Sequence, residues 1–270
     1  MKSVLLYVQD DEGLESRFDA ALALATASSG HLTCMQVTPS SAYVAFDGFG
    51  GVFIMADVMN KIEERRASVK AKVEAKLRRA DVAWDFIDCT DAPVHALVSR
   101  SALADIVVLS RSNEGPTERE ALSLAGDVAI HARTPVLVIP TATTMFNPCG
   151  RAMIAWNGSF EAANALRAAL PLLKKASDIQ VITVEEPDSK SLPSTSAAEY
   201  LSRHDISATV QQRGQGPLFP EKALQEVIDE LNPSYLVMGA YGHSRAREFV
   251  FGGVTRAMLK NSSIPVLFSH

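Results

Sequence analysis

The chain contains the same pattern of strands and helices twice. Residues 104–110 form a strand-like apolar run, and a second run follows at residues 134–140, with a helix-like segment between them. Residues 233–239 and 264–268 repeat this arrangement at nearly the same distance in the second half. Because a fixed internal period marks a duplicated structural unit, the sequence predicts two tandem copies of one small domain.

The beginnings of the two copies also correspond. Each copy starts with a strand, a helix and a second strand, which we place at residues 3–8, 17–28 and 32–37 in the first copy and at 151–156, 160–175 and 179–184 in the second. Short apolar runs that alternate with amphipathic helices are typical of a parallel sheet with helices on both faces. We therefore predict an α/β fold of two tandem, doubly wound, mostly parallel five-stranded sheets of Rossmann-like type, with domains at residues 1–142 and 150–270.

The segments outside this pattern have simple interpretations. The join between the copies, residues 141–150, has no periodicity and contains Asn147-Pro148-Cys149-Gly150, which indicates a linker. The first copy is longer because it carries a loop at residues 42–53 with three glycines, followed by a charged helix at about residues 57–79. We interpret the charges of this helix as a solvent-exposed face.

Charge and hydropathy exclude several classes of protein. The 270 residues carry a formal net charge of -5, which argues against a nucleic-acid-binding surface. No apolar run is long enough to span a bilayer, and the run from Val4 to Val8 is too short for a signal peptide. Three widely spaced cysteines, Cys34, Cys89 and Cys149, form no zinc-site pattern and are expected to be reduced thiols. We therefore expect a cytoplasmic protein with no nucleic-acid or membrane partner.

A glycine-rich pattern follows the fourth strand of the second copy. It runs from Gly239 through Gly242 to Gly252-Gly253-Val254-Thr255, and a helix is predicted over residues 256–261. Glycines let backbone amides approach a phosphate closely, and free N–H groups at a helix N-terminus favour an anion. In open α/β sheets such loops lie beyond the carboxyl ends of the strands, where ligands bind. The pattern predicts a phosphate site, with two ordinary turns as the alternative; it is no Walker loop, because Gly-Lys-Ser/Thr is absent from the sequence.

From Leu236 to Phe268 the sequence resembles the universal stress protein family, whose motif is G-x2-G-x9-G-Ser/Thr. The resemblance covers nearly the whole chain. It implies a fold like that of the adenine nucleotide α-hydrolases and ATP, ADP or AMP as the ligand, with Mg²⁺ as an optional companion. One departure is Gly253, which stands where the family has Ser or Thr. A side-chain donor is lost there, and the Thr255 hydroxyl is placed to compensate.

The resemblance also implies binding residues at other strand ends. Asn157 stands where the family commonly has an Asp that holds the base or ribose, and its amide can form hydrogen bonds but supplies no negative charge. Val184 matches a position that contacts adenine through its backbone, and Met238 matches a residue of the base pocket. The expected nucleotide-binding residues are Ala155, Trp156, Asn157, Val184, Met238, Gly239, Tyr241, Gly242, Gly252, Gly253, Val254 and Thr255.

The first copy lacks the glycine pattern. Ser110-Arg111-Ser112-Asn113 replaces the first two glycines, and Leu122-Ser123-Leu124-Ala125 aligns with Gly252–Thr255. Leucines leave less room for a phosphate, so we expect at most one nucleotide per chain. The first copy would stand where a second subunit stands in a dimer. The family's habit of pairing through the last strand then suggests that Pro135–Ile139 meets Pro265–Phe268 within one chain, and a homodimer of whole chains stays open.

Other polar residues give weaker signals. His243, Arg245 and Arg247 lie between the glycines and either reach a triphosphate or are exposed loop residues. The remaining histidines are scattered, and Asp10-Asp11-Glu12 is a lone acidic turn, so neither predicts a metal or catalytic site. No catalytic residue is predicted.

Two kinds of function remain open from the sequence. The first is a stress-response regulatory protein that binds ATP, ADP or AMP in its second copy, with at most slow ATP hydrolysis. The second is an interaction module that binds no nucleotide, in which Asn157 and Gly253 mark a decayed site. An adenylating ligase is disfavoured because neither copy has an SGGxD-type phosphate loop.

Overall fold

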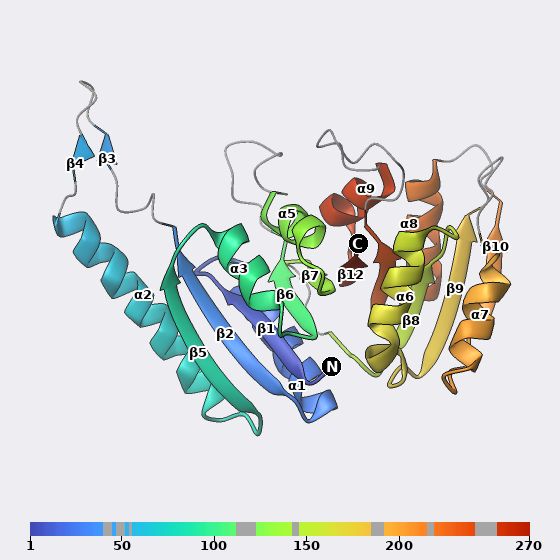
Figure 1. Ribbon diagram of the computed structural model, residues 1–270, viewed down its shortest axis with the longest axis horizontal. Helices are drawn as coiled ribbons and strands as arrows, with labels where there is room; N and C mark the ends of the chain where they lie inside the picture. Colours follow the sequence, from blue (N-terminus) through green and yellow to red (C-terminus); the bar gives the residue numbers. More distant parts are fainter. Residues whose placement is uncertain are drawn as a thin grey trace.

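The computed structural model shows a wide α/β molecule with helices on both faces of a central sheet (Figure 1). It describes residues 1–39, 45–46, 52–53, 56–111, 123–141, 146–184, 192–214, 219–240 and 253–270. The predicted site residues Tyr241, Gly242 and Gly252 lie outside these ranges, as do His243, Arg245, Arg247 and the glycines of the loop at 42–53.

The two halves contain the same succession of elements. The first half consists of β1 (Ser3–Val8), α1 (Leu14–Ser28), β2 (His31–Thr38), α2 (Ala56–Leu77), β5 (Ala83–Thr90), α3 (Pro93–Ser101), β6 (Ile106–Ser110), α5 (Ser123–His131) and β7 (Val136–Ile139). The second half consists of β8 (Arg151–Ala155), α6 (Phe160–Leu173), β9 (Asp178–Val184), α7 (Ser194–Ser202), β10 (Thr209–Arg213), α8 (Pro220–Leu231), β11 (Tyr235–Gly239), α9 (Gly253–Asn261) and β12 (Val266–Ser269). Between β2 and α2, the short strands β3 (Ala45–Phe46) and β4 (Val52–Phe53) pair as an antiparallel ribbon.

Each half contributes five parallel strands, and together they form one sheet. The strand order is β10-β9-β8-β11-β12-β7-β6-β1-β2-β5. The strands pair in parallel within each half, whereas β12 pairs antiparallel with β7, with Leu267 opposite Leu137. The predicted α/β class with two mostly parallel five-stranded sheets is thus confirmed, and the two sheets join edge to edge.

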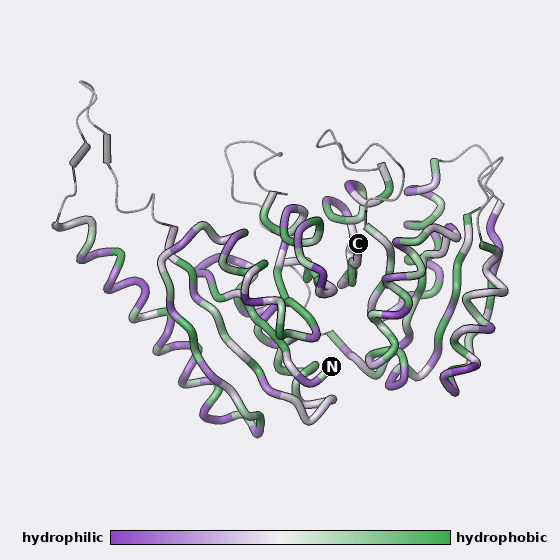
Figure 2. The backbone as a smooth tube through the Cα atoms, viewed as in Figure 1, coloured by the Kyte–Doolittle hydropathy of each residue, from purple (hydrophilic) through white to green (hydrophobic). Residues whose placement is uncertain are grey.

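The sheet has an apolar layer on each face. One layer lies under α1, α2, α6 and α7, and the other lies under α3, α5, α8 and α9. Side chains of α1 show why this helix packs as it does: Leu14, Phe18, Ala21 and Leu24 recur at three- and four-residue spacing and are all buried. In Figure 2 the strands at the centre are largely hydrophobic, whereas α2 at one side is largely hydrophilic.

Two segments that the sequence left to loops or solvent are packed. In the join between the halves, Phe146 is buried against the ring of Tyr235, with 5.8 Å between the ring centroids. The charged helix α2 packs through Val69 and Val73, and Arg65 pairs with Asp10 of the first half. Its charges are therefore partly used within the fold.

Helix α9 begins at Gly253, three residues before the predicted start at Arg256. The predicted start was wrong because Gly-Gly-Val-Thr was placed before the helix as part of the glycine pattern, whereas three of these residues belong to the helix itself. The first turn of a helix has few intrahelical bonds to lose, so glycine is tolerated there. As a result, Gly253, Val254 and Thr255 form the first turn of α9.

Of the helices in the described ranges, none is both long and apolar enough to cross a membrane.

Candidate functional site

The sheet reverses its direction of growth next to β8. From β8 the chain builds outward through β9 to β10 on one side, and then returns to place β11 and β12 on the other side. The connections after β8 and after β11 therefore leave the sheet toward opposite faces, and their strand ends bound a crevice. This is the position at which ligands bind in open α/β sheets.

A cavity of about 240 Å³ lies at this crevice. It is lined by Ala155, Trp156, Asn157, Ser159, Ile182, Val184, Pro220, Leu224, Met238, Gly239, Gly253, Val254 and Thr255. Every predicted site residue that the structure describes lies in this lining. Ser159, Ile182, Pro220 and Leu224 also lie there and were not predicted.

One end of the cavity is apolar. Ile182 and Met238 come from the strands on either side of β8 and are buried, while Pro220 and Leu224 come from the first turns of α8. Residues four apart on a helix share a face, so a sequence signal for Pro220 and Leu224 existed in their spacing. Such a surface suits a flat, weakly polar ring.

A tight turn after β8 forms the polar edge of the cavity. The backbone N–H of Ser159 donates to Asn157 Oδ1 at 3.2 Å, and the N–H of Ala162 donates to Ser159 Oγ, also at 3.2 Å. Gly158 has a φ of 72°, a left-handed conformation that favours glycine. With Oδ1 engaged in the turn, the Asn157 amide can offer a ligand its NH₂ donors.

Trp156 forms part of the cavity wall and is held in place at both its backbone and its ring. Its backbone N–H donates to Ile182 O at 2.8 Å, and its indole Nε1 donates to Leu192 O at 2.9 Å. The side chain is buried. A fixed aromatic wall of this kind gives a ligand a rigid surface to pack against.

The N-terminus of α9 forms another part of the cavity lining. Gly253 and Val254 begin the helix, and Thr255 is buried in the same turn. The first backbone N–H groups of a helix have no intrahelical acceptor, and the helix dipole adds positive potential there. A Cβ atom added at Gly253 would meet no heavy atom of the described residues within 4 Å, so within that part of the chain the space beside this residue is open.

Gly239 needs its lack of a side chain. A Cβ atom there would lie 2.6 Å from Ala162 N and from the carbonyl carbon of Glu161, both in the first turn of α6. The last residue of β11 can approach α6 this closely only as glycine. The cavity wall at this point is therefore backbone.

The comparisons with known proteins agree with this geometry. Residues 149–270 match the sequence profile of the universal stress protein family. The second half of the chain is therefore similar in sequence to that family. A universal stress protein from Archaeoglobus fulgidus DSM 4304 has the same fold over 99% of this chain and 96% of its own, with a TM-score of 0.76 at 17% identity.

Two further structures match at lower similarity. A putative universal stress protein from Pseudomonas aeruginosa UCBPP-PA14 and the functionally unknown protein PA1789 from Pseudomonas aeruginosa PAO1 each cover 100% of this chain, with a TM-score of 0.64 at 13% identity. This chain covers 93% and 92% of them, respectively. A search of curated proteins gave no match. These likenesses extend the fold of the universal stress proteins to the first half.

In the first half of the chain, larger side chains stand at the matching positions. Tyr7 is the fifth residue of β1, as Ala155 is of β8, and Ser110 ends β6 as Gly239 ends β11. Tyr7 lies beside Met35 in the sheet, as Ala155 lies beside Ile182. The Tyr7 side chain is buried, and its burial raises the pKa of the phenol to about 12.

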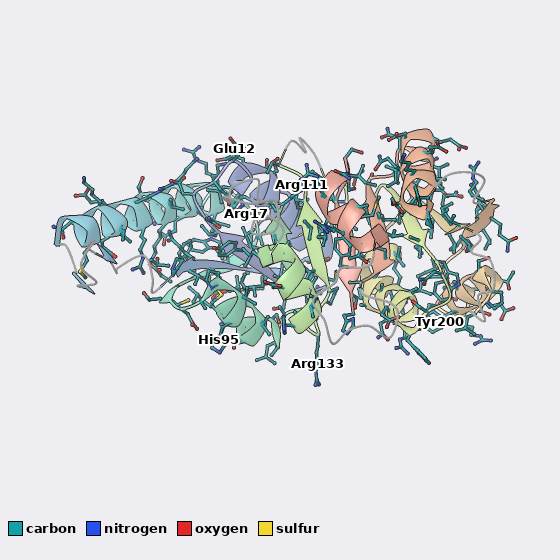
Figure 3. All side chains as sticks on the ribbon, turned by 90° about the horizontal axis from the view of Figure 1, so that it is seen from above. Glu12, Arg17, His95, Arg111, Arg133 and Tyr200 are labelled. Atoms are coloured by element: carbon teal, nitrogen blue, oxygen red, sulfur yellow. The ribbon has the colours of Figure 1, made fainter. Side chains whose placement is uncertain are left out.

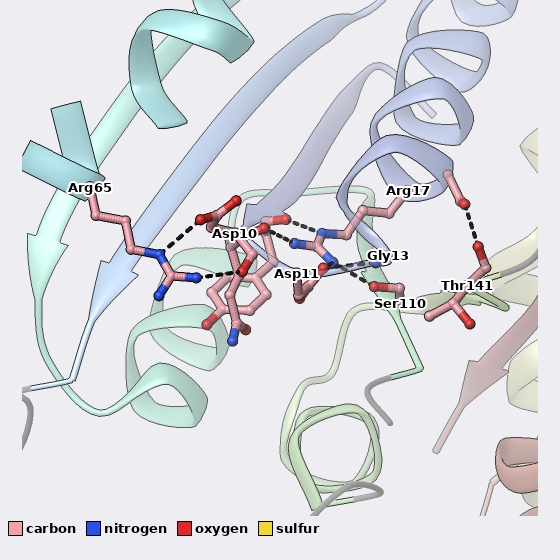
Figure 4. Close-up of polar contacts among 10 residues, drawn as sticks. Asp10, Asp11, Gly13, Arg17, Arg65, Ser110 and Thr141 are labelled. Atoms are coloured by element: carbon pink, nitrogen blue, oxygen red, sulfur yellow. Dashed lines mark hydrogen bonds and ion pairs between the residues drawn. The ribbon is translucent and has the colours of Figure 1, made fainter. Parts of the chain in front are cut away.

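Arg17 covers the strand ends of the first half with a network of hydrogen bonds (Figure 4). Its guanidinium donates to Tyr7 O at 2.8 Å and to Gln9 O at 2.6 Å. It also donates to Asp11 Oδ1 and Ser110 Oγ, both at 2.6 Å. Arg17 is 1% exposed, so this buried charge is neutralised by its partner and occupies the end of the sheet.

The sequence predicted that leucines of residues 122–125 close the first half. Leu122 lies outside the described residues, whereas Leu124 is half-buried and Ala125 is buried. Tyr7 and Arg17 were not predicted, although the contrast between Tyr7 and Ala155 at matching strand positions would have revealed the first of them.

The described residues contain no group of three His, Cys, Asp or Glu side chains that could hold a metal ion. In the acidic turn after β1, Asp10 pairs with Arg65 and Asp11 with Arg17. Cys34, Cys89 and Cys149 are free thiols.

Proposed function

We propose that the second half binds one adenine nucleotide in the cavity between β8, β11, α8 and α9, and that the chain uses this binding as a regulatory protein in a stress response. The observation that carries the proposal is the lining of the cavity, in which apolar side chains, the Asn157 amide and the N-terminus of a helix come together. The match of residues 149–270 to the universal stress protein family supports the stress-related role.

The apolar lining, the Asn157 amide and the N-terminus of α9 each suit one part of a nucleotide. The base would pack against Ile182, Leu224 and Met238, and the Asn157 amide would donate to the ribose. The phosphates would accept hydrogen bonds from the first turn of α9. The volume of about 240 Å³ is small beside the roughly 300–1,000 Å³ of usual ligand pockets. We therefore place the nucleoside inside the cavity and the phosphates along its opening at Gly253.

Binding rather than catalysis is the simpler proposal for this site. The lining residues that the structure describes include no His, Asp, Glu, Lys or Cys, so they offer no general base for the attack of water on a phosphate. We propose at most slow ATP hydrolysis. Any Mg²⁺ would be held mainly by the phosphate oxygens.

Calorimetric titration with ATP, ADP, AMP and adenosine tests the proposal. Gly253 provides a matched pair of variants, because a new side chain there has open space among the described residues. Gly253→Asp places a carboxylate where the phosphates would lie, and an acidic residue at a helix N-terminus does not weaken the fold. We expect Gly253→Asp to lower the affinity for ADP about tenfold or more, whereas Gly253→Ser, which adds a donor, keeps or raises it.

Two results would contradict the proposal. Wild-type protein that binds none of the four ligands at millimolar concentration would favour the interaction module that binds no nucleotide. Equal ADP affinity in Gly253→Asp and wild type would show that the phosphates do not lie at α9. Steady-state phosphate release from ATP, measured separately, tests the absence of efficient hydrolysis.

A further inference from the structure

One side chain of the first half reaches the helix that forms the phosphate end of the cavity. Arg111 directly follows β6, and its guanidinium donates hydrogen bonds to Lys260 O and Ser262 O at the C-terminal end of α9. The opposite end of the same helix, Gly253 to Thr255, lines the cavity. Figure 3 shows Arg111 pointing toward the second half, whereas Arg133 of the first half points away into solvent.

The residue of the second half that matches Arg111 makes no equivalent side-chain contact with the first half. The backbone N–H of Arg111 donates to Ile139 O, as that of Ala240 donates to Ser269 O, so the two residues occupy matching places in the two halves. Ala240 is buried and has no side chain that could reach α5 of the first half. The half whose strand ends are covered by Tyr7 and Arg17 thus supports the half with the cavity, and Ala240 gives α5 no matching side-chain hydrogen bond.

The chemistry of the contact suits a fixed support. The last carbonyl groups of a helix carry partial negative charge and have no intrahelical donors. The Nη1 group of Arg111 donates to two such carbonyl oxygens, Lys260 O and Ser262 O. Helix α9 has nine residues, a length of about 13 Å, so a shift or tilt at its C-terminus moves its N-terminus relative to β8.

We infer that Arg111 is a positioning residue of the ligand site: it holds α9 from the first half so that the N-terminal amides of this helix face the phosphates. The inference rests on the proposed nucleotide binding in the second half. It assigns the first half a definite part in that binding, since it places the C-terminal anchor of α9 across the junction of β7 and β12.

The test compares Arg111→Ala with Arg133→Ala, which removes the same charge from an exposed position of the same half. Because Arg111 acts through α9, its loss should weaken the binding of phosphates and spare the binding of the nucleoside. We expect the affinity for ADP to fall roughly 3- to 30-fold, with the affinity for adenosine within about twofold of wild type. Arg133→Ala should leave both affinities unchanged, and Arg111→Lys, which keeps the charge and one hydrogen bond, should lie in between. Arg111→Gln replaces Arg111→Ala if the alanine variant does not fold.

Amide hydrogen exchange without ligand provides an independent measurement. Arg111→Ala should speed the exchange of amides in residues 256–262, and Arg133→Ala should not. Unchanged exchange in α9, or equal losses of ADP and adenosine affinity in Arg111→Ala, would overturn the inference. If wild-type protein binds no nucleotide, the proposed function fails by itself, and the exchange data still decide whether Arg111 holds α9.

Discussion

The carboxyl ends of the first and fourth strands in the two halves share a backbone and differ in their side chains. In the second half, Ala155 and Gly239 leave a cavity of about 240 Å³. In the first half, Tyr7 and Ser110 stand at the matching places, and Arg17 bonds to both the backbone and the side chains there. The same fold therefore presents a cavity in one copy and a buried polar network in the other.

The comparison shows that the side chains at a few matched positions determine whether the strand ends leave space for a cavity. Small residues at the ends of β8 and β11 leave space and expose backbone, whereas a buried aromatic ring and a guanidinium satisfy the same strand ends internally. The hydrogen bonds that a ligand would make in one half are made by Arg17 in the other. The first half is then free to serve as a support, which Arg111 gives to α9.

The largest effect that we expect comes from removing the internal cover of the first half. Arg17→Met should lower the free energy of unfolding by about 3–5 kcal/mol, because it leaves the Asp11 carboxylate without its ion-pair partner and removes the guanidinium donors from Tyr7 O and Gln9 O. Urea denaturation measures this. Arg167→Met on the exposed side of α6 is the control and should change stability by less than about 0.5 kcal/mol. A small effect of Arg17→Met would mean that this network is not what stabilises the first half.

A second substitution carries the cover of the first half into the second. Ala155→Tyr places at β8 the residue that β1 has, so its ring should fill the apolar end of the cavity. We expect the affinity for ADP to fall about 100-fold, which corresponds to ~2.7 kcal/mol, while the unfolding midpoint stays near that of wild type. Ala155→Ser adds little volume and should bind as wild type does. Full ADP affinity in Ala155→Tyr would show that the ligand does not use this cavity.

A smaller effect is expected from alkaline pH. Burial raises the pKa of Tyr7 from its ordinary value of 10 to about 12, so the folded state holds this proton more tightly than the unfolded state. The resulting stability is fully present below about pH 10 and is lost as the pH rises toward about 12. Between about pH 9 and about pH 11 this loss amounts to ~1.4 kcal/mol.

Tyr7→Phe removes this contribution and keeps the ring in place. The decline in free energy of unfolding over this pH range should be smaller in Tyr7→Phe than in wild type by that amount. Burial also raises the pKa of Cys34 to about 12. The loss of stability caused by ionisation of this thiol is the same in both proteins, so it cancels in the difference. Identical pH profiles for the two proteins would contradict a buried phenol at this position.

The repeat and the glycine pattern predicted much of this molecule. Alternating apolar runs indicated the strands, since buried parallel strands are apolar on both faces, and the predicted residues at 155–157, 184, 238–239 and 253–255 line one cavity. Motif spacing sufficed here because the carboxyl ends of adjacent parallel strands lie together whatever the details of packing.

The parts that were not predicted depend on contacts between distant segments. Nothing local to Arg17 indicates that its side chain ends beside Ser110, 93 residues away. Likewise, the path of Arg111 to the carbonyl groups of Lys260 and Ser262 follows from the way in which β7 meets β12. Gly253 was placed outside α9 because the glycine pattern alone does not locate the first turn of a helix.

The number of nucleotides bound per chain tests the central claim most directly. Calorimetric titration of wild-type protein with ADP, with the active protein concentration determined independently, should give one site per chain. Ala155→Tyr should abolish that site, and Tyr7→Phe should leave it unchanged. Two sites per chain, or one site that survives Ala155→Tyr, would contradict the account of an open second half and a closed first half.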